Sequence, residues 1–230
     1  MPAGRVNEKR EQYGLSQLLA ETLDSGCKKY DEQEFDRILE MNAIDLGIEA
    51  ETSSLMVAVN APSEKMPLAA ALVSAMLSEP LFPDEAVDRE RENLLDEMKT
   101  SLLKPETVVR ELVRKNLFGK HPNGFGRKDQ LRTIASLRAD DLRNFYHKVC
   151  LSAPKTVIAF SGDISWKDAE KWSRMIIESC RWSRYCPPDL PEPEFPKRDS
   201  RETISLPREQ ACVFTALRGV ERYGVVLVVP

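Results

Sequence analysis

Residues 43–62, AIDLGIEAETSSLMVAVNAP, contain two alternating runs that are separated by a Thr-Ser-Ser turn. In the first run, residues 44–49, isoleucine and leucine alternate with polar residues or glycine. In the second run, residues 55–59, leucine and valine recur at every second position. A period of two is typical of a half-buried strand, so these residues predict a β-hairpin.

Two helices are predicted before this hairpin. Leucines recur at helical spacing within residues 13–23, and Gly26 follows where a left-handed cap could end the helix. Asp31 is suited to cap a second helix over residues 32–42, and Glu34 stands at the position of a capping box.

Helical patterns also follow the hairpin. Residues 62–78 are rich in Ala, Leu and Met and are apolar nearly all round, which predicts a helix buried in the core. Residues 84–104 are highly charged with a single apolar stripe, so this helix should lie across a surface. Residues 105–118 and 139–149 also have helical patterns.

The next segments predict a further strand and helix. KTVIAFSGD, residues 155–163, has the pattern of a short buried strand, and residues 165–180 form an amphipathic pattern with Ser165 as its cap. Strands and helices thus alternate within residues 1–184. We expect an α+β fold there, with an antiparallel or mixed sheet covered by helices.

Residues 185–197 are rich in proline and predict an extended linker. Residues 198–230 contain strand-like runs, and the last of them is an apolar run without a partner strand. This predicts the start of a second, truncated α/β subdomain. We do not expect Met1 to be the natural first residue, although the sequence leaves this open.

The composition excludes several classes of partner. Net charge is −4, with 33 basic residues mixed among 37 acidic ones, so no nucleic-acid-binding face is expected. No apolar stretch reaches the roughly 18 residues that a membrane span needs.

Five cysteines without a CxxC spacing argue against a disulfide framework and a thiolate zinc site. With no signal peptide in the first residues, an intracellular location is mildly favoured.

Four stretches together resemble the pitrilysin/insulinase family of zinc metallopeptidases, although each alone would be a weak signal. They are GLSQLLAETLDSG at 14–26, SAMLSEPLFPDEAVDREREN at 74–93, LFGKHPNGFGRKDQLRTIASLRADDLRNFY at 117–146 and TVIAFSGDIS at 156–165. The halves of such peptidases share a layered α/β fold, and the active half begins with a helix that carries His-x-x-Glu-His.

The resemblance places three residues of this chain on that motif. Gln17 stands in place of the first zinc-binding histidine, Ala20 in place of the glutamate base and Glu21 in place of the second histidine. Glutamine is a poor zinc ligand and alanine cannot accept a proton. The resemblance therefore implies no catalytic residue and no metal site in this chain, with zinc held by a partner half.

Two glutamates follow the family pattern further along. Glu90 and Glu97 lie one heptad apart in residues 84–104, and the resemblance places Glu97 at the third zinc ligand. A glutamate pair on a charged helix is more often a solvated face with Lys and Arg neighbours. That interpretation is favoured over a residual metal role.

The remaining candidate groups have simpler interpretations. His121 and His147 have no partner at ligand spacing, which favours ordinary polar or surface roles. Cys180 and Cys186 flank a helix end, where an incidental pair of thiols is more frequent than a metal clip.

The resemblance implies a non-catalytic half that forms the wall of a peptide-binding chamber opposite a zinc-bearing half. Such a half would hold unfolded peptides along exposed strand edges and would not hydrolyse them alone. Two alternatives remain: a structural assembly subunit, similar to the core proteins of respiratory complexes, and a hydrolase with Glu21, Glu90 and Glu97 around Mg²⁺ or Mn²⁺.

Overall fold

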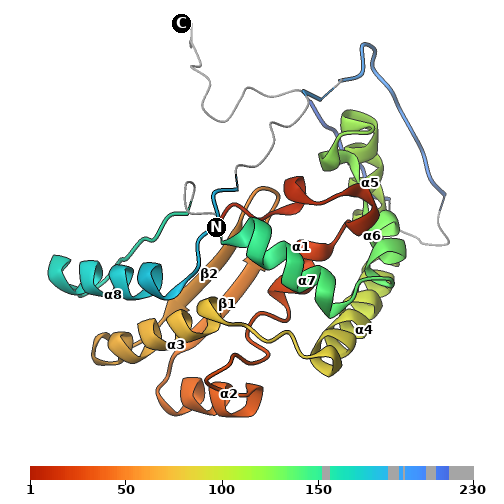
Figure 1. Ribbon diagram of the computed structural model, residues 1–230. Coiled ribbons are helices and arrows are strands. Elements are labelled where there is room, and N and C mark those ends of the chain that lie inside the picture. Colours follow the sequence, from red (N-terminus) through yellow and green to blue (C-terminus); the bar gives the residue numbers. More distant parts are fainter. Residues whose placement is uncertain (152–155, 186–191, 194, 206–210, 218–230) are drawn as a thin grey trace, which may run out of the picture.

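The computed structural model describes residues 1–151, 156–185, 192–193, 195–205 and 211–217. Within them, helices surround one antiparallel pair of strands, which confirms the expected α+β class (Figure 1). The elements in chain order are α1 Leu15–Ala20, α2 Glu32–Met41, β1 Asp45–Ala50, β2 Leu55–Asn60, α3 Met66–Ser78, α4 Asp84–Ser101, α5 Pro105–Phe118, α6 Arg127–Ile134, α7 Ala139–Phe145 and α8 Trp166–Ser179. Short 3-10 turns precede α1 at Arg5–Asn7 (η1) and Arg10–Gln12 (η2).

The hairpin forms as its alternation predicts. β1 and β2 pair antiparallel in a register that runs from Asp45 opposite Asn60 to Ala50 opposite Leu55. Residues 1–6 lie against the turn end of this hairpin. The backbone N–H groups of Arg5 and Val6 donate to the carbonyls of Glu51 and Thr52 at 3.2 and 3.0 Å.

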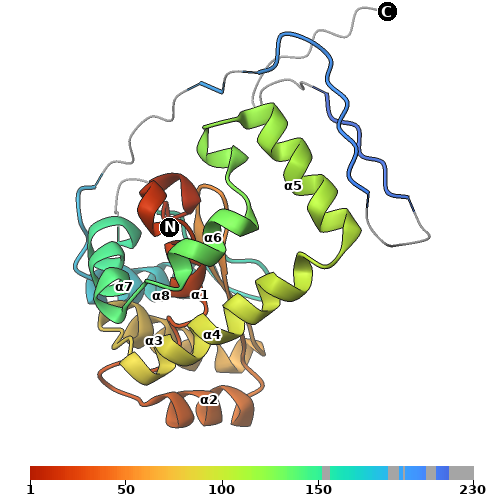
Figure 2. The same ribbon diagram turned by 90° about the vertical axis from the view of Figure 1, so that its right-hand side faces the viewer.

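Helix α1 lies in the middle of the molecule. It contacts β1, α4 and α7 and buries Leu15, Leu18 and Leu19 almost completely (Figures 1 and 2). Gln12, just before it, donates from Nε2 to Asp141 Oδ1 on α7 at 3.0 Å. Burying leucines from so short a helix yields more free energy than its own hydrogen bonds do, so tertiary packing holds α1 in place.

The first helix is shorter than the sequence predicts. Residues 13–23 were expected to be helical, but α1 ends at Ala20. The Thr22 hydroxyl donates to the Leu18 carbonyl at 2.8 Å, and the chain turns there, because a side-chain donor offers the backbone an alternative to further helix. Gly26 does adopt a left-handed φ of 113°, but in the loop beyond this turn.

The other helices before α6 largely follow their patterns. Asp31 accepts a hydrogen bond from the Glu34 N–H at 2.8 Å and so caps α2. Helix α3 is buried on most sides, and α4 buries only a stripe that includes Val87, Leu94 and Met98. Figure 2 shows α4 crossing the outer surface and α5 extending from its end at the edge of the molecule.

The strand expected at 155–163 is not formed within the described residues, and that prediction was wrong. Val157 is 82% exposed, and residues 156–160 line a cavity of about 310 Å³ together with β2 and α3. Residues 156–163 are assigned to neither a helix nor a strand. A strand needs a hydrogen-bonded neighbour, which the local sequence cannot supply by itself.

The end of the chain leaves the expected linker and second subdomain as predictions. No helix or strand is assigned in 192–193, 195–205 or 211–217, and the remaining residues after 185 lie outside the described part. Among the described residues, no helix combines the length and apolar character that crossing a bilayer requires.

Candidate functional site

The three motif positions, two on α1 and one directly after it, meet at one cavity. Gln17, Ala20 and Glu21 line a largely polar hollow of about 420 Å³, whose other walls come from β1, α5 and α6. The structure thus brings the sequence-predicted positions together and places a strand edge beside them.

A buried carboxylate holds α1 in this position. Glu8 accepts hydrogen bonds from the backbone N–H groups of Gly14 at 2.8 Å and Ser16 at 2.7 Å, and from the Ser16 hydroxyl at 2.5 Å. Gly14 itself has a φ of 101°, which favours glycine. Burial raises the pKa of Glu8, and its hydrogen bonds oppose that shift. Glu8 therefore satisfies donors at the start of α1 that have no partner within the helix.

The donor groups at the motif positions do not fit a catalytic zinc ion. Gln17 Oε1 accepts from Gln130 Nε2 at 3.4 Å, and Ala20 offers only a methyl group. Glu21 is then the one charged donor among the three positions, whereas catalytic zinc needs about three protein ligands. Within the part of the chain that the structure describes, no group of three His, Cys, Asp or Glu is placed to hold a metal ion.

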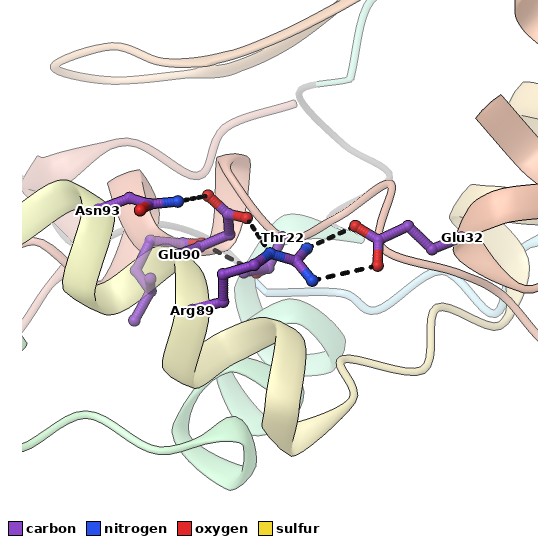
Figure 3. Close-up of polar contacts among 6 residues, drawn as sticks. Thr22, Glu32, Arg89, Glu90 and Asn93 are labelled. Carbon is purple, nitrogen blue, oxygen red and sulfur yellow. Dashed lines mark hydrogen bonds and ion pairs between the residues drawn. The ribbon is translucent and has the colours of Figure 1, made fainter.

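Glu90 and Glu97 on α4 are engaged with arginines. Arg89 Nε donates to Glu90 Oε1 at 2.8 Å, and Asn93 Nδ2 donates to Glu90 Oε2 at 3.1 Å. Figure 3 shows the Arg89 guanidinium between the carboxylates of Glu90 and Glu32, which links α4 to α2. Glu97 Oε1 lies 3.9 Å from Arg127 Nη1.

The carboxylates of α1 and α4 still influence one another. Burial raises the pKa of Glu21, and the neighbouring charges of Glu90, Glu97 and Asp24 raise it further. The three glutamates of the predicted site are thus close enough to repel but are not gathered around one point.

Replacing Glu21 by glutamine is expected to stabilise the fold slightly at neutral pH. A raised native pKa means that the charged form is disfavoured in the folded state. This penalty exists above the raised pKa and disappears below the ordinary value of 4.5, where both states are protonated. Because Glu21 is exposed, we expect a gain of only about 0.3 kcal/mol.

Urea unfolding of Glu21→Gln at neutral pH and below pH 4.5 measures this difference. Glu92→Gln is the matched control, because Glu92 is exposed on α4 and has no ion pair among the described residues. An equal gain at both pH values would contradict an electrostatic origin.

The edge of β1 that faces the cavity carries unpaired backbone groups. Leu55 exchanges hydrogen bonds with Met1 at 2.8 Å in both directions, so Leu55 and its partner Ala50 form a non-hydrogen-bonded pair of the hairpin. Pairs alternate along an antiparallel ladder, so Leu46, Ile48 and Ala50 direct their N–H and C=O groups away from β2. No backbone partner for these three is found among the described residues, and Ile48 and Ala50 line the cavity.

Four arginines at the same cavity were not anticipated from the sequence. Arg5 comes from η1, Arg110 and Arg114 from α5, and Arg127 from the start of α6. Only the spacing of Arg110 and Arg114, one helical turn apart, could have signalled a shared face. Arg5 and Arg127 come to the same cavity only when the chain folds.

The histidine and cysteine candidates have other positions, and neither His121 nor Cys180 lines this cavity. His121 is buried, and its Nδ1 accepts the Asn123 N–H at 3.1 Å, so it closes a turn after α5. Cys180 is buried near the end of α8, and Cys186 lies outside the described residues.

Comparison with known sequences finds relatives over most of the chain. A Helicobacter pylori protein described as "Non-peptidase homolog YmxG" is 25% identical over 165 residues, 70% of this chain and 37% of that protein. A Bacillus subtilis protein described as "Uncharacterized zinc protease YmxG" is 27% identical over 143 residues, 61% of this chain and 33% of that protein. The chain spans about a third of the length of these curated relatives.

Solved structures share the fold at low identity. An inactive domain of a peptidase M16 from Pseudomonas fluorescens matches with a TM-score of 0.76 and 20% identity, over 84% of this chain and 47% of that one. Pitrilysin matches with a TM-score of 0.71 and 16% identity, over 84% of this chain and 21% of that one. Residues 1–126, more than half of the 230, match the family described as insulinase (peptidase family M16). The resemblance seen in the sequence is thereby confirmed: this chain belongs to the insulinase family of peptidases.

Proposed function

We propose that this chain is a non-catalytic half of an insulinase-type peptidase. It forms one wall of a chamber for unfolded peptides, and a zinc-bearing half, on the same polypeptide or on another subunit, forms the opposite wall. The chain holds substrate and does not hydrolyse it alone.

The observation that carries this proposal is the free edge of β1, which lies beside a motif without the zinc-binding histidines and the glutamate base. Ile48 and Ala50 offer outward backbone groups at a cavity where Gln17 and Ala20 stand in place of the first histidine and the glutamate base of the motif. An extended peptide can add to such an edge as a further strand, with main-chain hydrogen bonds supplying affinity. The edge to which a peptide can bind is therefore present, although the catalytic groups of the motif are absent.

Two descriptions of similar proteins support a role without catalysis, whereas the Bacillus subtilis relative is described as a zinc protease. The Helicobacter pylori relative is described as a non-peptidase, and the Pseudomonas fluorescens domain is described as inactive. A carboxylate metal site is less favoured, because Glu90 is already bound by Arg89 and Asn93 and lies outside the cavity. Loss of hydrolysis on Glu97→Gln would be the signature of that alternative.

Pairing with a zinc-bearing half tests the proposed role. The purified chain is mixed with a zinc-bearing insulinase-family half, and hydrolysis of a quenched fluorescent peptide is followed. We expect no hydrolysis by the chain alone and a faster rate for the pair. A partner whose rate is unchanged over a range of chain concentrations would contradict the proposal.

Ile48→Pro is expected to weaken peptide binding about tenfold, because proline removes one outward N–H and its ring obstructs the edge. The hairpin keeps its ladder, since the Ile48 N–H does not bond to β2. Fluorescence anisotropy with a labelled unfolded peptide measures the change.

Val57→Pro is the matched control for this substitution. Val57 stands opposite Ile48, and its N–H points to the other edge of the hairpin. Equal weakening by both substitutions would place the peptide elsewhere or indicate general damage to the sheet.

A further inference from the structure

Most of the arginines at the cavity form no ion pair with a carboxylate of the described residues. Among the described residues, Arg5, Arg110 and Arg114 have no carboxylate within ion-pair distance. Arg127 Nη1 is buried without a hydrogen-bond partner, and its nearest carboxylate oxygen is Glu97 Oε1 at 3.9 Å. Positive charge therefore gathers at one place in a chain whose net charge is −4.

Neutral contacts hold these side chains at the cavity. Arg5 Nη2 donates to Thr52 Oγ1 at 3.1 Å, and Arg114 Nε donates to the Asn123 carbonyl at 3.2 Å. Arg110 lies over the Phe214 ring at 5.9 Å. A guanidinium has five N–H donors, so each of these arginines keeps donors for a ligand.

The clustering has an energetic cost. Burial lowers the pKa of Arg114, and repulsion from Arg5 and Arg110 lowers it further, whereas Tyr13 and Glu111 oppose the shift. Like charges that share a partly desolvated cavity oppose folding unless an anion joins them. Bound carboxylate oxygens would offset this repulsion by accepting charge-assisted hydrogen bonds.

The acidic residues of the cavity wall offset this repulsion only in part, through the attraction between Glu111 and Arg114. Glu111 Oε1 accepts the Arg127 backbone N–H at 2.5 Å at the start of α6. Glu49 is exposed, and Glu21 lies towards the carboxylates of α4. The side of the cavity next to α4 is acidic, and the side next to α5 is basic apart from Glu111.

We infer that the basic side of this cavity binds a carboxylate side chain of the bound peptide, so that the chain selects unfolded peptides with acidic residues. This inference rests on the proposed peptide-binding role and adds a specificity to it. A cavity of about 420 Å³ is far larger than one carboxylate, and the free edge of β1 forms part of its wall. A strand added to that edge would direct alternate side chains to one face, where Arg5 and Arg114 stand.

Two labelled, unstructured peptides test this specificity by fluorescence anisotropy. One carries Glu-Asp at its centre, and the other carries Gln-Asn in an otherwise identical sequence. We expect the acidic peptide to bind the full chain about ten to a hundred times more tightly, as charged hydrogen bonds predict, with the advantage lost at high salt.

Substitutions locate the effect in the protein. Arg114→Gln should remove most of the preference for the acidic peptide, and Arg114→Lys, which keeps the charge, should retain part of it. Arg174→Gln is the charge-matched control, because Arg174 pairs with Glu170 on α8. Melting temperatures of the free variants show whether a loss reflects unfolding. If Arg114→Gln unfolds, the comparison of the two peptides on the unaltered chain still decides.

The outcomes separate the two proposals. Equal binding of both peptides would overturn the acidic preference and leave the peptide-binding role intact. Binding of neither peptide would overturn both. Inorganic phosphate and free glutamate probe the charge alone, and if either binds as tightly as the acidic peptide, the assignment to a peptide side chain is overturned.

Discussion

Replacing Glu8 with alanine is expected to lower the free energy of unfolding by about 3 kcal/mol, because the backbone N–H groups of Gly14 and Ser16 lose their partner in a buried place. The loss is a large fraction of the 5–15 kcal/mol that holds typical domains together. Chemical unfolding followed by circular dichroism measures it.

Two further variants make the Glu8 prediction specific. Glu8→Gln should lie between the wild type and alanine, because an amide has one acceptor oxygen and can replace only part of the contacts. Glu11→Ala, an exposed carboxylate in η2, should change stability by less than about 0.5 kcal/mol. If Glu8→Ala behaves like Glu11→Ala, α1 does not depend on this cap.

Gly4→Ala is expected to destabilise the fold by about 2–3 kcal/mol through overpacking. A methyl group at Gly4 would lie 2.5 Å from backbone atoms of Thr52, Ser53 and Ser54 in the hairpin turn. Backbone cannot rotate away as a side chain can, so residues 1–6 or the turn must shift. The φ of Gly4 is −84°, which alanine adopts freely, so the cost is purely steric.

Gly47→Ala is the control for this steric effect. Gly47 lies in β1, and no atom lies within 4 Å of a methyl group added there. We expect a change within about 0.5 kcal/mol, and alanine is if anything favoured over glycine in a strand. Thermal unfolding of both variants makes the comparison, and similar melting temperatures would contradict tight packing at Gly4.

Elements whose residues carry their own pattern were predictable from the sequence. The hairpin, the cap of α2 at Asp31 and the buried helix α3 all depend on neighbouring residues, and they formed as expected. The end of α1 was not predictable in this way, because the Thr22 hydroxyl competes with the helix. The run 156–160 has strand composition, but it carries no strand assignment in the described part of the chain.

The candidate site was likewise only partly predictable from the sequence. The positions of Gln17, Ala20 and Glu21 follow from one short stretch, and the structure gathers them at one cavity. The basic side of the cavity joins Arg5 to Arg114 and Arg127, which are more than a hundred residues away in sequence. Such a cluster has no periodicity and is visible only after folding.

The contact between Gln12 and Asp141 spans 129 residues, and it has a consequence for synthesis on the ribosome. At an elongation rate of about 5–20 residues per second, roughly ten seconds separate the emergence of these two residues. During that time the leucines of α1 have no α7 to pack against, while the hairpin can already close from neighbouring residues. The nascent chain therefore leaves the leucines of α1 without their α7 contacts throughout this interval, which makes residues 15–20 a natural binding segment for a holdase chaperone until α7 is made.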